Sequence, residues 1–321
     1  MTSREHAPVL PAQDLRVTID QLWVYPIKSC AGTRLPRARL LPHGLDGDRT
    51  WMVVDAEGQF VTQRDVPAMA LVQPQLHGTD LVLTAPGLPA LTVTPQATGP
   101  LCRATVWGDT VDAIDAGDAA AQWWHQALAL LAPGLPDSVA RGVRLVQFPA
   151  QPTQPRLSSK RWTHGQDVPN HFSDGFPVLV TSTASLAELN QRLATAGHAA
   201  VDMRRFRPNI VLGGTEAHDE DVLSRLTVAM PVVGAVSDGS GHTVAAELAL
   251  TKPCARCPIP NIDPDTAVSA QAVSAVLQTY RADARLNGAV TFGMNAFATH
   301  LADGGVWLHE GQVVDAEWYF E

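Results

Sequence analysis

Two cysteines at the spacing Cys-x-x-Cys, Cys254 and Cys257, lie in the carboxyl-terminal third of the chain with Arg256 between them. Positive charge beside a thiol favours the thiolate, which is the form that attacks electrophiles and binds soft metals. Three prolines close to the pair stiffen the backbone on both sides. The segment therefore predicts a reactive or metal-binding thiolate.

The spacing by itself leaves three other interpretations open. A zinc knuckle needs a second Cys or His pair, and Cys30 and Cys102 do not supply one at a suitable spacing. A thioredoxin-like redox pair usually opens a helix, whereas Pro258 and Pro260 follow Cys257 and disfavour a long helix there. Both cysteines can also be inert residues of a core.

The elements that must position this thiolate are mostly short strands. Residues 1–16 are polar and proline-containing and are expected to form a disordered leader. From Val17 to about residue 150, short β-type runs alternate with turn signals, as in an antiparallel barrel. A helix is expected over 118–132, with Asp118 as its N-cap.

A long loop over residues 150–172, rich in Pro, Gln, Ser and His, leads into a second, mixed unit. In that unit we expect strands over 177–182 and 206–214, and helices over 185–197 and 272–282. The acidic run His218–Asp221 is interpreted as a solvated turn. The predicted fold is mixed α/β and rich in β-structure.

Composition excludes several classes of protein. The chain has 321 residues and a net charge of −9, which argues against nucleic-acid binding. It has three lysines, so most of its positive charge is arginine, which suits bidentate contacts with oxyanions. Four unevenly spaced cysteines do not suggest a disulfide framework, and because no long apolar run occurs we expect neither a signal peptide nor a membrane span. We expect a cytoplasmic protein that makes no membrane contact.

The cysteine segment, Cys-Ala-Arg-Cys followed by Asn-Ile-Asp-Pro-Asp-Thr, resembles that of MOSC (molybdenum cofactor sulfurase C-terminal) proteins. Other motifs resemble the branch of that family that includes the mitochondrial amidoxime-reducing component and bacterial YcbX-like proteins. They are Tyr25-Pro-Ile-Lys-Ser-Cys30, Leu45-Asp-Gly-Asp-Arg-Thr-Trp51, Phe60-Val-Thr-Gln-Arg64, His171-Phe-Ser-Asp-Gly-Phe-Pro177 and Phe206-Arg-Pro-Asn-Ile210. The resemblance covers residues 17–320.

This resemblance implies an N-terminal β-barrel-like domain over residues 17–150 and a MOSC β-barrel domain with peripheral helices over 151–321. It implies an enzyme that binds the molybdenum cofactor (molybdopterin) and reduces small N-hydroxylated compounds. The alternative is a non-catalytic carrier of the cofactor, or a module that transfers sulfur through a persulfide on Cys257.

The family also implies roles for individual residues. Cys257, the second cysteine of the pair, would be the metal ligand, and Asp174 a catalytic proton donor or acceptor. Lys28, Ser29 and Arg49 would hold the phosphate of the pterin. The cofactor contacts would be completed by Arg207, Asn209 and Arg256. Taken singly, each of these residues also fits a plain strand-end or turn position, and Arg256 can instead act on Cys257.

Electrons must come from elsewhere if this chain is a reductase. A plant-type [2Fe–2S] centre needs Cys-x4-Cys-x2-Cys with one more cysteine downstream, and the sequence has no such cluster. It has no dinucleotide fingerprint either. We therefore expect no iron–sulfur cluster in this chain and a separate electron-donor protein of the ferredoxin or flavoprotein type. Cys30 and Cys102 are predicted to be packing residues.

Overall fold

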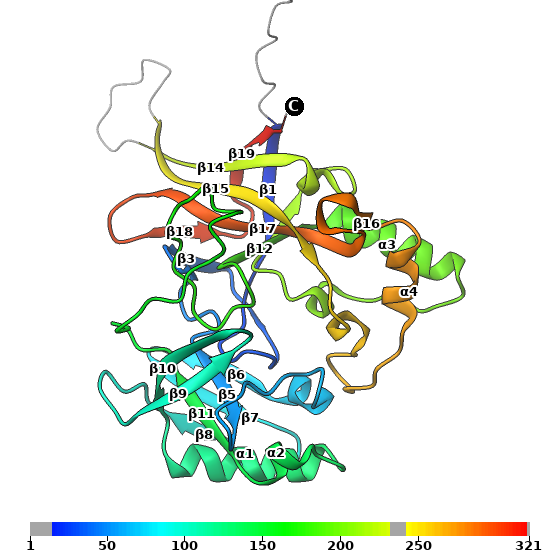
Figure 1. Ribbon diagram of the computed structural model, residues 1–321. Coiled ribbons are helices and arrows are strands. Elements are labelled where there is room, and N and C mark those ends of the chain that lie inside the picture. Colours follow the sequence, from blue (N-terminus) through cyan, green and yellow to red (C-terminus); the bar gives the residue numbers. More distant parts are fainter. Residues whose placement is uncertain (1–14, 232–241, 320–321) are drawn as a thin grey trace, which may run out of the picture.

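A closed barrel of seven strands forms the larger of two lobes (Figure 1). The computed structural model describes residues 15–231 and 242–319, so most of the predicted leader, residues 1–14, lies outside it. In order around the barrel the strands are β12 (Val178–Ser182), β13 (Ile210–Gly213), β1 (Leu15–Val24), β19 (Val313–Trp318), β14 (Leu223–Pro231), β15 (His242–Ala255) and β17 (Ala289–Leu301). The pairing of β12 with β17 closes the ring.

Strand β1 shows how the sequence builds this barrel. Val17 and Ile19 are buried, and after a register shift between Ile19 and Gln21 the buried positions become Leu22 and Val24. One extra residue in a strand reverses which face the following side chains point to, so the shift keeps both apolar pairs inside. The strand begins at Leu15, so the last two residues of the predicted leader, Leu15 and Arg16, belong to it.

Shorter elements complete the large lobe. Strand β2 (Thr33–Arg34) pairs with β1, and β16 (Ala282–Asp283) pairs with β17. A small sheet of β18 (Val306–His309), β3 (Arg37–Leu41) and β4 (Gly44–Leu45) shares the apolar core of the barrel. Helices α3 (Thr183–Thr195) and α4 (Ala272–Gln278) lie on its outside and bury leucines and valines against Phe206 and Phe292.

The smaller lobe holds two antiparallel sheets. One contains β5 (Trp51–Asp55), β11 (Val143–Gln147), β10 (Asp109–Asp115) and β9 (Leu101–Val106), and the other β6 (Gln73–His77), β7 (Asp80–Thr84) and β8 (Leu91–Val93). Helices α1 (Asp118–Leu131) and α2 (Asp137–Ala140) cover its lower end in Figure 1. Alternate residues of β5 enter two different apolar clusters, so the whole strand is buried.

The predicted β-rich fold with peripheral helices is confirmed, with local differences. Gly117, at φ 90°, is the N-cap of α1, and Asp118 lies in its first turn, where it pairs with Arg144. Helix α4 ends at Gln278, four residues before the predicted end, and Arg281 beyond it pairs with Asp221. Residues 148–177 form the expected long loop between β11 and β12, without a helix or a strand.

Candidate active site

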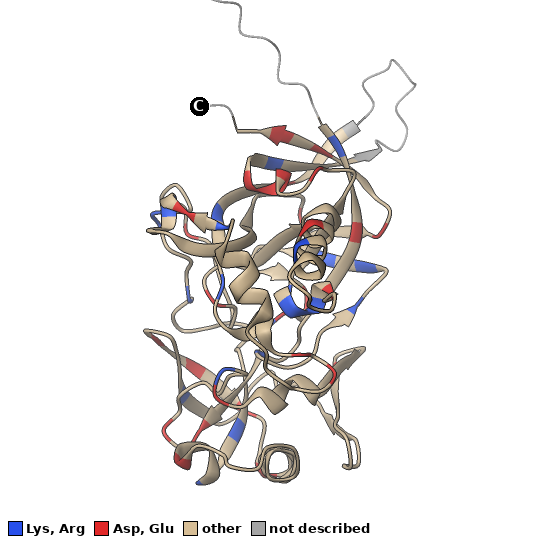
Figure 2. Cartoon of the chain, turned by 90° about the vertical axis from the view of Figure 1, so that its right-hand side faces the viewer, with Lys and Arg blue, Asp and Glu red and all other residues tan. Residues whose placement is uncertain are grey.

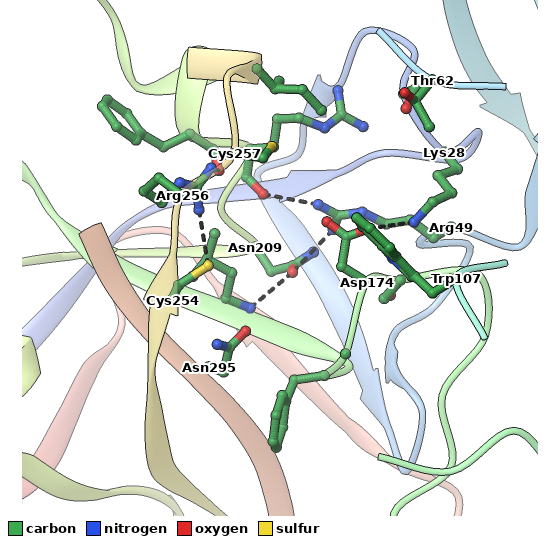
Figure 3. Close-up of a pocket in the computed structure, with 18 of the residues that line it drawn as sticks. Lys28, Arg49, Thr62, Trp107, Asp174, Asn209, Cys254, Arg256, Cys257 and Asn295 are labelled. Carbon is green, nitrogen blue, oxygen red and sulfur yellow. Dashed lines mark hydrogen bonds and ion pairs between the residues drawn. The ribbon is translucent and has the colours of Figure 1, made fainter. Parts of the chain in front are cut away.

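All eight residues that the sequence singled out line one cleft between the lobes. Figure 3 labels Lys28, Arg49, Asp174, Asn209, Arg256 and Cys257 among them. The cleft contains about 730 Å³ of empty space, part of which is open solvent. The eight residues come from five separate segments. They are the turn after β1 (Lys28, Ser29), the turn after β4 (Arg49), the long loop (Asp174), the start of β13 (Arg207, Asn209) and the end of β15 (Arg256, Cys257).

The backbone is strained where it approaches the cleft. Ser29, Arg49, Trp107 and Arg207 have φ angles of 66°, 46°, 55° and 57°, in the left-handed region that residues with a Cβ rarely adopt. These four are half of the non-glycine residues with positive φ in the described chain. Such strain persists only where the surroundings enforce it, and it gathers at functional sites.

Positive charge in the cleft exceeds negative charge. Lys28 pairs with Asp174 and Arg49 with Asp48, whereas Arg64, Arg207 and Arg256 form no ion pair with any carboxylate of the described residues. Acidic and basic residues are otherwise spread over both lobes (Figure 2), so this excess is local. A cleft with three unpaired guanidinium groups, in a chain of net charge −9, is suited to an anionic ligand.

Asp174 faces two donors from the small-lobe side of the cleft. Its Oδ1 atom lies 2.5 Å from Lys28 Nζ and 3.1 Å from the Trp107 indole nitrogen. Partial burial raises the pKa of the carboxyl, but the Lys28 charge and these two hydrogen bonds outweigh it and hold the pKa well below its usual value. The carboxylate is therefore ionised at neutral pH, where it accepts hydrogen bonds and holds no proton to donate.

The amide of Asn209 is largely occupied within the protein. Its Oδ1 accepts from Arg49 Nη1 and from the Leu179 backbone, both at 3.1 Å, and its Nδ2 donates to Trp23 O at 3.2 Å. The residue is 1% exposed. These bonds favour a role in orienting the Arg49 guanidinium over direct contact with a ligand.

The cysteine segment places both thiols at the cleft. Arg256 Nη1 lies 3.0 Å from Cys254 Sγ and Nη2 donates to Phe206 O at 2.9 Å, so this guanidinium contacts the first cysteine and not Cys257. Cys257 lines the cleft and is partly exposed. Within residues 15–231 and 242–319, no group of three or more His, Cys, Asp or Glu could hold a metal ion, whereas a structural zinc site uses four such ligands.

Two residues that contact the site, Trp107 and Arg156, escaped the sequence analysis. Trp107, at the tip of the β9–β10 hairpin, stacks on the Arg64 guanidinium at 4.4 Å. The buried Arg156 donates to the carbonyls of His171, Ser173 and Asp174 and to the carboxylate of Asp109. A signal for Trp107 existed, since it is a large aromatic residue before Gly108 in a turn. No feature of the sequence pointed to Arg156.

The expected packing role suits Cys30, which is completely buried.

Comparison with known proteins gives two family matches. The family model described as "MOSC N-terminal beta barrel domain" matches residues 16–130, and the one described as "MOSC domain" matches residues 167–315. Mitochondrial amidoxime-reducing component 1 of Mus musculus is 33% identical over 260 residues, which are 78% of this chain and 67% of that protein. The Homo sapiens protein of the same name is 33% identical over 276 residues, 82% of this chain and 72% of that protein.

A more distant match is the molybdenum cofactor sulfurase of Bos taurus. It is 28% identical over 247 residues, which are 71% of this chain but 26% of that protein. Among the described helices, none is both long and apolar enough to cross a membrane.

Proposed function

The chain belongs to the family of proteins that combine a MOSC N-terminal β-barrel domain with a MOSC domain, and on this premise we propose that it is a molybdenum-cofactor-dependent oxidoreductase that reduces N-hydroxylated compounds. One observation carries the proposal. The candidate metal ligand Cys257 shares a cleft with three guanidinium groups that have no described carboxylate partner, as an anionic pterin requires. The names of the amidoxime-reducing relatives support the substrate type.

The residues of the cleft fit this cofactor. Cys257 would supply the thiolate, a soft ligand that suits a molybdenum centre. Arg207 and Ser29, with the remaining N–H groups of Lys28 and Arg49, would hold the phosphate, and Arg256 would face the pterin. Asn209 would act through Arg49. When bound, the cofactor supplies a two-electron redox centre.

Asp174, held by its hydrogen-bond partners, would bind the substrate in the cleft. Because the carboxylate is ionised and 66% exposed, it can accept a hydrogen bond from an N–H or O–H group of an N-hydroxylated molecule. Lys28 and Trp107 occupy its Oδ1 atom, which leaves Oδ2 for that contact. Electrons would come from a separate ferredoxin- or flavoprotein-type donor, and the cytoplasmic location stays a prediction from the sequence.

The proposal is tested by expressing the full chain in a host that makes the molybdenum cofactor. Metal and pterin analysis should find about one molybdenum and one pterin per chain. The anaerobically reduced protein should then convert benzamidoxime to benzamidine, and the Cys257→Ser variant should not. A loaded, reduced wild-type protein that converts neither benzamidoxime nor 6-hydroxylaminopurine would contradict the proposal.

The alternative, a carrier or persulfide sulfur-transfer module, has support from the molybdenum cofactor sulfurase among the relatives. Mass spectrometry of the intact protein separates the two functions. A persulfide on Cys257 in a protein without bound molybdenum favours sulfur transfer, and stoichiometric molybdenum with turnover favours the reductase.

A further inference from the structure

The buried aromatic ring of Tyr25 contacts two of the arginines of the cleft, Arg49 and Arg207. The Cζ atoms of Arg49 and Arg207 lie 4.4 Å and 4.3 Å from the centroid of the ring. Tyr25 itself is 1% exposed, and its hydroxyl oxygen has no hydrogen-bond partner among the described residues. The hydroxyl group therefore does not fix the position of this side chain by a hydrogen bond. The face of the ring, in contrast, makes two cation–π contacts.

These contacts oppose an electrostatic cost. Burial and, after it, the charge of Arg49 lower the pKa of Arg207 to about 10, so the surroundings disfavour the second guanidinium charge. The negative face of an aromatic ring attracts a cation within about 6 Å, and the attraction is stronger where water is excluded. A neutral ring that contacts both groups stabilises them side by side and adds no negative charge of its own, so Asp48 is the one carboxylate paired with either arginine in the described chain.

The main chain around Tyr25 is bound to the same two arginines. Arg49 N donates to Tyr25 O at 2.8 Å, and Tyr25 N donates at 2.8 Å to Asp48, the ion-pair partner of Arg49. Arg207 donates from Nη1 to the carbonyl of Cys30, and Arg49 donates from Nη2 to Arg207 O at 2.9 Å. Gly32 lies so close to the ring that a Cβ there would overlap it.

We propose that Tyr25 is a positioning residue whose ring, and not its hydroxyl, holds Arg49 and Arg207 together to bind the phosphate dianion of the ligand in the cleft. This inference rests on the proposed function, because the phosphate is that of the pterin. Tyr25 does not touch the ligand. It acts through the two guanidinium groups, which keep their charge and their remaining N–H donors for the oxyanion.

Four variants of the full chain test this role. Tyr25→Phe keeps the ring, Tyr25→Leu removes it, and Gly32→Ala displaces it by steric overlap at a backbone position that tolerates alanine. Trp124→Leu is the matched control, since it removes a fully buried aromatic residue that does not line the cleft, from helix α1 at the lower end of the small lobe (Figure 1). Two quantities are measured, the pterin content after expression in a cofactor-producing host and the Kd of the cofactor-free protein for inorganic pyrophosphate.

Tyr25→Phe should stay within twofold of wild type in both quantities. Tyr25→Leu and Gly32→Ala should weaken pyrophosphate binding at least tenfold and lower the pterin content. Trp124→Leu should lower the unfolding temperature while the Kd stays at the wild-type value. If Tyr25→Leu does not fold, Gly32→Ala and Tyr25→Phe still decide the matter.

The role of the ring is refuted if Tyr25→Phe loses binding as severely as Gly32→Ala, or if Gly32→Ala and a folded Tyr25→Leu bind like wild type. Failure of the proposed function looks different. In that case wild type itself acquires no pterin, while pyrophosphate binding still follows the order of the variants.

Discussion

Lys28 and Asp174, 146 positions apart in the sequence, meet at 2.5 Å across the cleft between the two lobes. The lysine is buried and its second hydrogen bond goes to Phe172 O at 2.8 Å, so Asp174 is its ion-pair partner. A buried ammonium that loses its carboxylate keeps the cost of desolvation without the compensating attraction. Protonation of Asp174 should therefore weaken the ion pair and lower the stability of the protein.

Asp174→Asn should lower the free energy of unfolding by about 1–2 kcal/mol at pH 7, a value reduced because the carboxylate is open to solvent. The folded-state pKa of Asp174 lies below its unfolded-state value near 4. Its stabilisation is thus complete above about pH 4 and is lost as the pH falls through the folded-state pKa. Urea unfolding at several pH values should show the difference between wild type and variant shrinking in acid. Asp118→Asn, at a 96% exposed ion pair, should cost under about 0.5 kcal/mol.

Arg156 fixes the loop that carries Asp174, so Arg156→Lys should loosen that loop although the charge is kept. A lysine cannot reproduce the planar fork that reaches three carbonyl groups and Asp109. We expect a loss of about 2–4 kcal/mol in stability and faster amide hydrogen exchange over residues 171–175. Arg103→Lys, at an exposed pair on the same hairpin as Asp109, is the control and should leave that exchange unchanged. If amide exchange over residues 171–175 is equally slow in Arg156→Lys and Arg103→Lys, Arg156 does not fix this loop.

Arg207 should contribute to pyrophosphate binding through both its charge and the planar geometry of its guanidinium group. Arg207→Lys should weaken pyrophosphate binding by about tenfold, because bidentate contact with an oxyanion is lost. Titration calorimetry at two salt concentrations measures this. The exposed Arg16, which does not line the cleft, serves as control, and Arg16→Lys should bind like wild type. Identical affinities for the two variants would remove Arg207 from the ligand site.

For Glu220 we predict the opposite dependence of stability on pH from that of Asp174. It is completely buried against Ser185, and burial raises its pKa above the ordinary value. The stabilisation from its protonated form is therefore present below about pH 4 and is lost as the pH rises through the raised value. Glu220→Gln should be more stable than wild type at pH 8, by about 1 kcal/mol, with the gain vanishing at pH 4. A variant less stable than wild type at pH 8 would show that the ionised carboxylate is favourable.

The sequence motifs that supply the candidate site fall where a strand ends or a turn begins, so their residues could be named from the sequence, and their roles stay predictions. The structure brings those turns to one cleft, with Ser29, Arg49 and Arg207 in left-handed conformations. The interpretation of His218–Asp221 as a solvated turn was wrong. Glu220 is 0% exposed because helix α3 brings Ser185 against it, a contact that no local pattern of charges reveals.

Other site residues depend on contacts between remote segments. Trp107 reaches Asp174 from 67 positions away, and Arg156 binds its loop from within a stretch that reads as polar linker. Arg256 was expected to act on the cofactor or on Cys257; its guanidinium contacts Cys254 and not Cys257, and its contact with the cofactor stays a prediction. Side-chain direction at a strand end follows from packing, and packing is not encoded in the spacing of a motif.

The central claim is that Cys257 supplies the thiolate to molybdenum in this cleft. X-ray absorption at the molybdenum edge, on loaded wild type, Cys254→Ser and Cys257→Ser proteins, measures the sulfur atoms around the metal. We predict the wild-type sulfur count in Cys254→Ser, and in Cys257→Ser either one sulfur fewer per molybdenum or no bound metal. An unchanged sulfur count in Cys257→Ser, or a loss confined to Cys254→Ser, would contradict the account.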